Sequence, residues 1–482
     1  MTKKISITLI SIFLILILYI SFSYEYGISI AKEGSYPLPK DSIDWKLISD
    51  TAAKDLQGYI KIRSIRGNEK EACLYLQKIL KREGISSKII EYPGDPLRAN
   101  LIAELPGELN EGGVILANHT DVVEANSKEW ERDPFSGDIA NGRVFGRGAV
   151  DMKGMGIMQL HAFIQIKKKN IKLKRKLMFL AMADEETGSK QGAKFLVERH
   201  PEIFKGYEYV LNEGGVGTKD VAIPGSKIFN LQYAEKGILW IRVISTGTSG
   251  HGSTPPTNYA TLDLMKFLFD LQEMETSVTI TDETSKFFYQ MGEASKFPNS
   301  FFLKRAHNPI VKKILAGIIK GNRHLRAMTS NTRSITSLST EKAGPNVITD
   351  KAEAVVDIRL LPGITPENYL EKIQELAKGR NITIEVISKQ PPTSSDLNGE
   401  LFQILSSVAM KNETGAVITP FLSPGATDSH FLRKLGLKCY GLIPAIMTAE
   451  DIDGMHGKNE SISIQNLQLG MKVIYEMIYG MN

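Results

Sequence analysis

Two adjacent glutamates, Glu185 and Glu186, closely follow the apolar run of residues 176–183 (KLMFLAMA). The run predicts a buried strand, because it is short, apolar and bounded by charges. A buried strand that ends in acids is costly unless a cation lies there. Residues 114–121 (VILANHTD) repeat the arrangement, with an apolar run that ends in histidine and aspartate. Such ligands, with one spare carboxylate to deprotonate water, are what metal-assisted hydrolysis requires.

Five residues form a candidate two-metal set whose side chains suit zinc: His119, Asp151, Glu186, Glu213 and His456. Asp151 lies in a glycine-rich turn, residues 146–154 (GRGAVDMKG), which lets the backbone bend closely around a site. A single aspartate there can bridge two ions. Each residue taken alone also suits a hydrogen-bonded or solvated position, so the hypothesis rests on the set.

Two further carboxylates complete the chemistry. Asp121 follows His119 by two residues, and its carboxylate is expected to orient the imidazole and raise its basicity. Glu185 is the spare carboxylate, and beside two cations it can take a proton from water and deliver it to a leaving amine.

The pattern of residues 46–236 alternates helical and strand-like segments, which predicts an α/β domain with a largely parallel sheet. Helices are expected at 47–60, 69–83 and 155–168, and strands at 101–105, 113–117, 177–183 and 209–212. Sites in such sheets form at the carboxyl ends of strands. We therefore expect His119, Glu185 and Glu213 to lie just past three strand ends.

Residues 237–392 predict a small α+β domain inserted into the first, and residues 393–482 return to the α/β pattern. In the inserted domain, strands are expected at 238–245, 352–359 and 382–388, and helices at 261–273 and 366–378, with residues 275–335 irregular. An apolar group in this irregular part either lines an acyl-chain groove or forms a helical pair over the domain core: Phe297, Phe301, Phe302, Leu303, Ile310, Val311, Ile314 and Leu315.

The chain has 482 residues, a formal charge of +5 and an ordinary balance of 42% hydrophobic and 23% charged residues. The basic run at residues 167–176 is interpreted as a solvated helix end and loop rather than a site for an anionic membrane surface or nucleic acid, because no aromatic residues interleave with it. The two cysteines, Cys73 and Cys439, lie far apart in sequence and are expected to be buried free thiols.

Residues 5–24 carry no charge and follow Lys3 and Lys4. Their length predicts a transmembrane anchor, and the lysines place the N-terminus in the cytoplasm. A cleaved signal peptide is the alternative. Either way the body of the protein is expected outside the cytoplasm, membrane-anchored or secreted, with residues 25–45 as a tether.

Five motifs stand in the order found in one enzyme family: residues 119–121 (HTD), 146–154 (GRGAVDMKG), 184–188 (DEETG), 212–215 (NEGG) and 249–255 (SGHGSTP). Over residues 45–480 the chain resembles the di-zinc exopeptidase family of aminoacylase, glutamate carboxypeptidase and carboxypeptidase S. Its length, anchor and long middle segment are most similar to the carboxypeptidase S branch, which includes the N-fatty-acyl-amino-acid synthase/hydrolases.

The resemblance implies two zinc ions per chain. One would be held by His119, Asp151 and Glu213, and the other by Asp151, Glu186 and His456. Glu185 would be the general base and acid, supported by Asp121. The peptide after Asp151 is cis in members of this family, so the same is expected here.

The inserted domain would be a lid and dimerisation domain. His251 would polarise the scissile carbonyl, and Asn346 and Arg359 would bind the substrate carboxylate. Residues 425–428 (GATD) match a loop that closes one wall of the site. Two positions depart from the family pattern: Thr349 replaces a frequent proline, and His430 stands where arginine is expected, so its role stays open.

The resulting hypothesis is a zinc-dependent hydrolase that cleaves an amide bond next to a free carboxylate, in short peptides or N-acyl amino acids. It would bind no nucleic acid, and its lid would offer a surface for a homodimer. A deacylase of a specialised acetylated or succinylated amino acid is the nearest alternative. A non-catalytic anchored peptide-binding protein would need no metal, and the complete ligand set argues against it.

Overall fold

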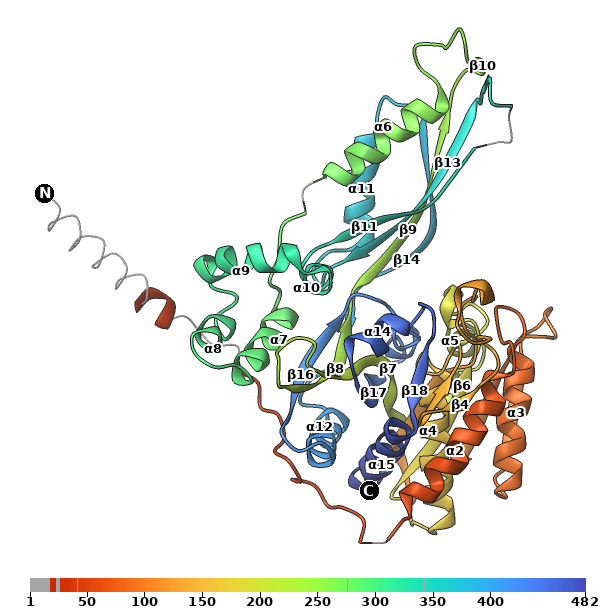
Figure 1. Ribbon diagram of the computed structural model, residues 1–482, viewed down its shortest axis with the longest axis vertical. Helices are drawn as coiled ribbons and strands as arrows, with labels where there is room; N and C mark the ends of the chain where they lie inside the picture. Colours follow the sequence, from red (N-terminus) through yellow and green to blue (C-terminus); the bar gives the residue numbers. More distant parts are fainter. Residues whose placement is uncertain (1–17, 23–26, 41, 275, 341–343) are drawn as a thin grey trace, which may run out of the picture. The chain divides into compact units, whose positions relative to one another are not determined.

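The computed structural model describes residues 18–22, 27–40, 42–274, 276–340 and 344–482 (Figure 1). The chain forms two compact units. The larger unit comprises Ile28–Tyr233, Ser394–Phe421 and Thr427–Asn482. The smaller unit comprises Ala234–Thr393, Leu422–Ala426 and the N-terminal residues up to Gly27.

A nine-stranded sheet has the order β1-β2-β6-β3-β7-β17-β8-β15, with β16 paired to β8. Its centre is parallel: β6 (Arg175–Met182), β3 (Leu109–His119), β7 (Tyr207–Lys219) and β17 (Lys438–Met447). Strands β1 (Ser87–Glu91) and β2 (Ala99–Leu105) are antiparallel at one edge, and β8 (Lys227–Glu235) is antiparallel to β7 and β17. The remaining strands are β15 (Thr393–Ser394) and β16 (Ala416–Ser423).

The sheet is therefore mixed, and the expectation of a largely parallel sheet holds only for its centre. The chain reverses between β1 and β2 and between β7 and β8 through short connections. A parallel crossover needs a dozen or more residues, so these connections force antiparallel pairs.

Helices cover both faces of the parallel centre, as strand β6 requires, because its residues 177–182 are all apolar and buried. Phe179 of β6 meets Phe163 of α4 (Lys153–Lys168), with ring centroids 6.2 Å apart. The alternate residues Met178 and Leu180 belong to a different cluster with Phe195 of α5 (Ala193–Arg199) and residues of α13. The other helices of this unit are α2 (Trp45–Ile60), α3 (Glu69–Arg82), α12 (Glu400–Asn412), α13 (Ser429–Arg433), α14 (Ala449–Gly454) and α15 (Ile464–Gly480).

A second, three-stranded sheet lies in the larger unit, in the order β18-β5-β4. Its strands are β4 (Ile139–Ala140), β5 (Arg143–Phe145) and β18 (Ser461–Ser463). Phe145 pairs with Ser461 in this sheet. The pairing brings the glycine-rich turn after β5 beside the loop before β18, although more than 300 residues separate them in sequence.

The smaller unit is built on an antiparallel sheet of order β11-β13-β9-β14. The strands are β9 (Gly237–Thr246), β11 (Thr332–Thr340), β13 (Lys351–Leu360) and β14 (Ile382–Gln390). Helices α6 (Ala260–Glu273) and α11 (Pro366–Ala377) bury their apolar sides against it. Strands β10 (Gly250–His251) and β12 (Val347–Ile348) form a separate pair.

The expectation that residues 275–335 are irregular is wrong for most of this range. They form α7 (Asp282–Glu293), α8 (Asn299–Leu303), α9 (Pro309–Gly321) and α10 (Arg323–Thr329). Side-chain caps at Thr281, Asn308 and Asn322 begin three of these helices. Val311 and Leu315 are buried while Ile314 is exposed, which agrees with the helical-cover interpretation of the apolar group.

Cys73 and Cys439 are both free and buried, as expected. The anchor expected at residues 5–24 lies mostly outside the described residues. Within the described ranges, no helix is long and apolar enough to cross a membrane.

Asp55 joins three helices of the larger unit. Its carboxylate contacts Arg82 of α3 at 2.8 Å and His161 of α4 at 3.0 Å. Burial raises the pKa of Asp55, but the bonds from His161 and Arg82 outweigh it and lower the pKa below its usual value. A lowered pKa stabilises the fold above the unfolded-state value, and this stabilisation is lost as pH falls through the folded-state pKa.

We therefore predict that Asp55→Ala lowers the free energy of unfolding at neutral pH by about 2 kcal/mol, because it leaves the buried imidazole of His161 without its partner. The difference from the wild type should shrink below about pH 4, where the carboxylate is protonated in the unfolded chain. Urea denaturation of the variant and the wild type, at neutral pH and below about pH 4, measures the difference in unfolding free energy. An equal difference at both would contradict the electrostatic explanation.

Candidate metal centre

The parallel strands bring three candidate residues to one edge of the sheet. His119 is the last residue of β3, is 1% exposed, and pairs in register with Met182 at the end of β6. After β6 the chain turns through Asp184, which has a φ of 66°, into a short 3-10 helix, Glu185–Thr187. Glu185 and Glu186 therefore lie in a turn next to the end of β3, where His119 is located.

Glu213 corrects one expectation, because it lies within β7 rather than past its end. The strand pairs with β3 over its first part and with β8 over its last, and Gly214 and Gly215 lie between. A Cβ on Gly215 would lie 1.7 Å from the carbonyl oxygen of Asn230, so only glycine lets the strand pass there.

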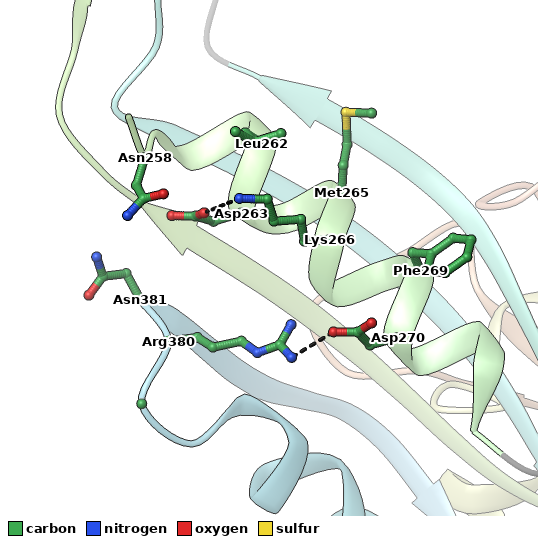
Figure 2. A pocket seen from close by; sticks show the side chains of 10 residues that line it. Asn258, Leu262, Asp263, Met265, Lys266, Phe269, Asp270, Arg380 and Asn381 are labelled. Carbon is green, nitrogen blue, oxygen red and sulfur yellow. Dashed lines mark hydrogen bonds and ion pairs between the residues drawn. The ribbon is translucent and has the colours of Figure 1, made fainter. Parts of the chain in front are cut away.

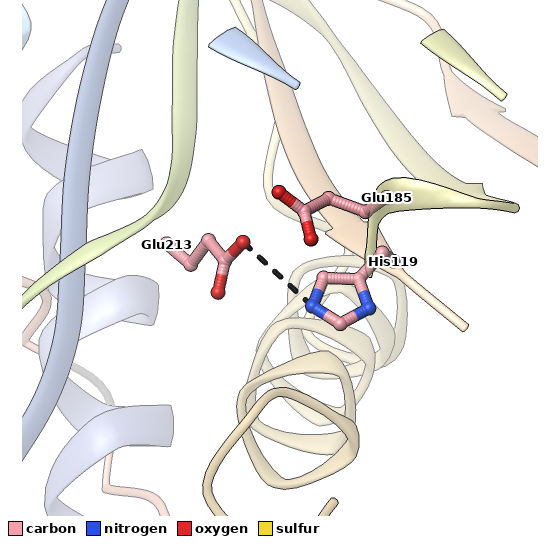
Figure 3. Close-up of side chains that lie close together, drawn as sticks. All are labelled: His119, Glu185 and Glu213. Atoms are coloured by element: carbon pink, nitrogen blue, oxygen red, sulfur yellow. Dashed lines mark ion pairs between the residues drawn. The ribbon is translucent and has the colours of Figure 1, made fainter. Parts of the chain in front are cut away.

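The side chains expected to bind metal converge, and Figure 3 shows two of them, His119 and Glu213, beside Glu185. His119 Nε2 lies 3.1 Å from Asp151 Oδ1 and 3.7 Å from Glu213 Oε1. His456 Nε2 lies 3.0 Å from Asp151 Oδ2 and 3.2 Å from Glu186 Oε1. Asp151 thus stands between the two histidines with one oxygen toward each.

Glu185 lies in the same cluster: one donor atom each from His119, Glu185 and Glu213 fall within 4.8 Å of one another. A second group of the same tightness contains His119, Asp151 and Glu186. Proximity alone therefore does not separate Glu185 from the ligands.

Asp121 holds the turn that carries both glutamates. Its two carboxylate oxygens accept hydrogen bonds from the backbone N–H groups of Glu185 (3.2 Å) and Glu186 (3.0 Å). One of these oxygens lies 3.3 Å from His119 Nδ1, and the Asp121 carbonyl lies 2.9 Å from the same nitrogen. Asp121 therefore fixes the imidazole orientation and the acidic turn together.

The cluster carries excess negative charge. Burial, followed by the charge of Asp151, raises the pKa of Glu213 to about 7. Burial and the charge of Glu213 raise the pKa of Glu185 well above its usual value. Burial alone would lower the pKa of His119, but the surrounding carboxylates, Glu213 first, raise it instead. Crowded carboxylates around two imidazoles are the environment that a divalent cation stabilises.

Glu460 is a site residue that the sequence reasoning missed. It is 1% exposed, and its carboxylate accepts hydrogen bonds from the N–H groups of Gly148 (3.0 Å), Val150 (2.7 Å) and Asp151 (3.0 Å). Arg147 donates to the same carboxylate at 2.7 Å and to the carbonyl of Gly457 at 2.7 Å. The loop that carries Asp151 is thereby tied to the loop that carries His456.

The ion pair between Arg98 and Asp184 is a second contact that the sequence did not predict, next to the turn that carries Glu185 and Glu186. Arg98 is 4% exposed and its Nη1 lies 2.7 Å from Glu69 and 3.2 Å from Asp184. Asp184 also accepts a hydrogen bond from the N–H of Gln191 at 3.1 Å. The buried guanidinium offsets the charge of Asp184, which directly precedes Glu185.

The peptide Asp151–Met152 is cis, as expected.

His430 is 2% exposed and lies edge-on to Phe431. Its pKa is lowered to about 3 by burial, followed by the charges of Lys434 and Arg433. It is therefore a neutral, packed side chain. Asp428, at the end of the 425–428 loop, is 1% exposed, and burial raises its pKa to about 7.

The three residues expected to bind substrate all belong to the smaller unit. Asn346 Nδ2 lies 3.3 Å from His251 Nε2, so these two side chains meet. Arg359 instead forms a bidentate ion pair with Asp357, at 2.7 and 3.0 Å. Arg359 lies eight residues along β13 from Lys351, about 26 Å, and Asn346 lies beyond the Lys351 end.

Figure 2 shows a surface hollow in the smaller unit, between α6 and the turn that precedes β14. The charged side chains that line this hollow form ion pairs with one another: Arg380 lies 2.6 Å from Asp270, and Lys266 lies 3.9 Å from Asp263. None of the candidate site residues is among the ten that line it.

The chain matches known proteins over most of its length. It is 26% identical to the N-fatty-acyl-amino acid synthase/hydrolase of Xenopus tropicalis over 504 aligned residues, which cover 99% of this chain and 95% of that protein. It is 25% identical to aminoacylase-1 of Sus scrofa, with 80% and 85% covered.

Among solved structures, an M20 family metallo-carboxypeptidase from Sulfolobus solfataricus shares the fold, with a TM-score of 0.70 and 22% identity. The alignment covers 89% of this chain and 98% of that one. The sequence profile described as peptidase family M20/M25/M40 matches residues 115–480. The chain therefore belongs to peptidase family M20/M25/M40 and is a hydrolase.

Proposed function

We propose that this protein is a di-zinc hydrolase that cleaves an amide bond next to a free carboxylate, in short peptides or N-acyl amino acids. The observation that carries the proposal is the position of Asp151, whose two oxygens face His119 and His456 separately. The relatives named as aminoacylase-1 and as an N-fatty-acyl-amino acid synthase/hydrolase support the substrate class.

The donor atoms fit two zinc ions. His119, Asp151 and Glu213 would hold one, and the second would be held by Asp151, Glu186 and His456. This assignment gives each ion three protein ligands and leaves open positions, as catalytic zinc requires. When bound, the two ions would polarise the scissile carbonyl and acidify a water molecule.

Glu185 is the carboxylate left over when both ligand sets are complete. We assign it the proton transfers: it accepts a proton from the attacking water and returns it to the leaving nitrogen. Asp121 holds the backbone of this residue in place through the hydrogen bond at 3.2 Å. His251 would donate a hydrogen bond to the oxyanion.

Metal removal tests the ligand assignment with two readouts. Chelation should abolish hydrolysis and lower the melting temperature, because a ligand that binds only the folded state stabilises it by about 4 kcal/mol at about a thousandfold excess over Kd. Zinc should restore both, with two equivalents bound per chain. Unchanged melting and turnover after verified removal of metal would contradict the proposal.

The substrate carboxylate would be bound by Asn346 and Arg359. Since these residues lie at opposite ends of β13, one carboxylate cannot reach both within a single smaller unit. We therefore include in the proposal a homodimer, in which His251 and Asn346 of one copy serve the site of the other.

Heterodimers test this arrangement. We predict that co-expression of His251→Ala with Glu185→Gln, under separate tags, yields heterodimers with about half the wild-type turnover per dimer, since one of two composite sites is intact. Each homodimer alone should be inactive and serves as the control. If the sites are formed within one chain, the heterodimers will be inactive as well.

We also propose that residues 5–24 anchor the protein, with its body outside the cytoplasm. The uncharged length of this segment and the two preceding lysines support an anchor. Protease accessibility of the body in intact cells, together with the N-terminal sequence of the mature protein, separates an anchor from a cleaved signal peptide.

A further inference from the structure

Residues 294–340 of the smaller unit carry nine lysines and arginines and no aspartate or glutamate. The segment includes α8, α9 and α10 (Figure 1). The preceding acid, Glu293, contacts Lys304 at 2.5 Å. Lys312, Lys313 and Lys320 of α9 form no ion pair with any described residue. Positive charge therefore gathers without compensation along this helix.

Helix α9 has one broad apolar side, and only part of it is covered. Val311, Leu315 and Ile319 are buried in the unit, with exposed fractions of 0%, 7% and 1%. On the side of the helix that adjoins these residues, Ile314 and Ile318 are 51% and 65% exposed. These two residues are four apart and share one face of the helix.

Glycines and lysines border the exposed isoleucines of α9. Gly317 and Gly321 lie on it between the isoleucines and Lys313 and Lys320, which share one edge, seven residues apart. Elsewhere in the same unit, in the turn before α8, Phe297 is 81% exposed. An apolar face bordered by lysines is the pattern of a helix that lies in a membrane interface.

The N-terminal segment reaches the same unit. A Cβ on Gly27 would lie 3.5 Å from the hydroxyl oxygen of Tyr289, which belongs to α7. Gly27 is three residues from the end of the proposed anchor, which corresponds to about 10 Å of extended chain. The smaller unit is thus tethered close to any bilayer that residues 5–24 enter. This closeness to a bilayer rests on the anchor proposed above.

We propose that α9 docks on an anionic lipid surface. Ile314 and Ile318 enter the boundary between headgroups and acyl chains, and Lys313 and Lys320 contact lipid phosphates. A second copy suits this face less, because isologous pairing would bring like-charged lysines together. Nucleic acid suits it less, since isoleucine offers no ring on which bases stack.

A fluorescent probe on the full chain tests the docking. Cys73 and Cys439 are buried, so a cysteine introduced by Ile318→Cys can be labelled selectively with an environment-sensitive fluorophore. In phosphatidylcholine vesicles containing phosphatidylglycerol we expect a blue shift and quenching by brominated acyl chains. High salt, or the triple variant K312E/K313E/K320E, should abolish both effects. Met265→Cys on α6, 57% exposed in the same unit, is the matched control and should show neither.

Three outcomes would overturn the proposal: equal behaviour of the probes at positions 318 and 265, equal signals in vesicles without phosphatidylglycerol, or a concentration-dependent shift without lipid, which indicates self-association. Failure of the anchor has a separate signature, because the chain would then not sediment with neutral vesicles. A phosphatidylglycerol-dependent shift at position 318 would still support α9 docking in that case.

Discussion

Glu185→Gln should lower kcat roughly 10⁴-fold, the upper end of what one acid–base group contributes, because this residue moves the proton in both directions. The amide is nearly isosteric with the carboxylate but cannot accept a proton from water. Since Glu185 is not assigned as a ligand, zinc content should stay at the wild-type value and KM should change little.

The neighbouring residue provides the matched control. Glu186→Gln removes an assigned zinc ligand, so it should lose zinc as well as turnover. Metal analysis of both variants beside steady-state kinetics separates the two roles. If Glu185→Gln keeps turnover, or loses zinc as Glu186→Gln does, the assignment of Glu185 as general base is wrong.

Glu460→Ala is expected to have the second largest effect, although this residue is not among the assigned ligands. The change leaves the buried guanidinium of Arg147 unpaired and removes the acceptor for three backbone N–H groups. We expect a loss of about 3–5 kcal/mol in unfolding free energy. Because the loops carrying Asp151 and His456 are released, zinc affinity should weaken about 10–100-fold.

A buried carboxylate elsewhere in the larger unit serves as the control for Glu460. Glu476 of α15 is 6% exposed and accepts a hydrogen bond from Asn412 at 2.7 Å. Glu476→Ala should lower stability without altering zinc affinity, measured by competition with a chromogenic chelator. Equal zinc affinity in the two variants would show that Glu460 acts on stability alone.

The sequence predicted part of the cluster of candidate ligands because His119, Glu186 and Glu213 follow apolar runs. His119 and Glu185 could be placed at strand ends from hydrophobicity alone. Glu213 could not be placed as accurately, because the two glycines after it let β7 continue to Lys219.

The supporting contacts could not be predicted in the same way. Glu460 follows His456 by four residues in a polar loop and resembles a solvated acid in the sequence. Only the pairing of β18 with β5 brings it to the backbone of Asp151. Such a long-range contact leaves no periodic signal, and the same holds for Arg98 and Asp184.

A helical pair was considered for the apolar group of residues 297–315, but α7 and α10 were missed for a different reason. Amphipathic helices are recognised by one apolar and one polar face. Helix α10 has only seven residues, about two turns, so a period of 3.6 residues leaves little signal in its sequence.

The most direct test of the proposed function is amino-acid release by the zinc-loaded full chain. The panel would contain dipeptides and N-acyl amino acids of graded acyl length, each beside its carboxamide counterpart. We predict release from members with a free carboxylate and little from the carboxamides, because Asn346 and Arg359 would lose their ionic partner. Cleavage of no member while zinc is bound, or equal cleavage of the carboxamides, would contradict the account.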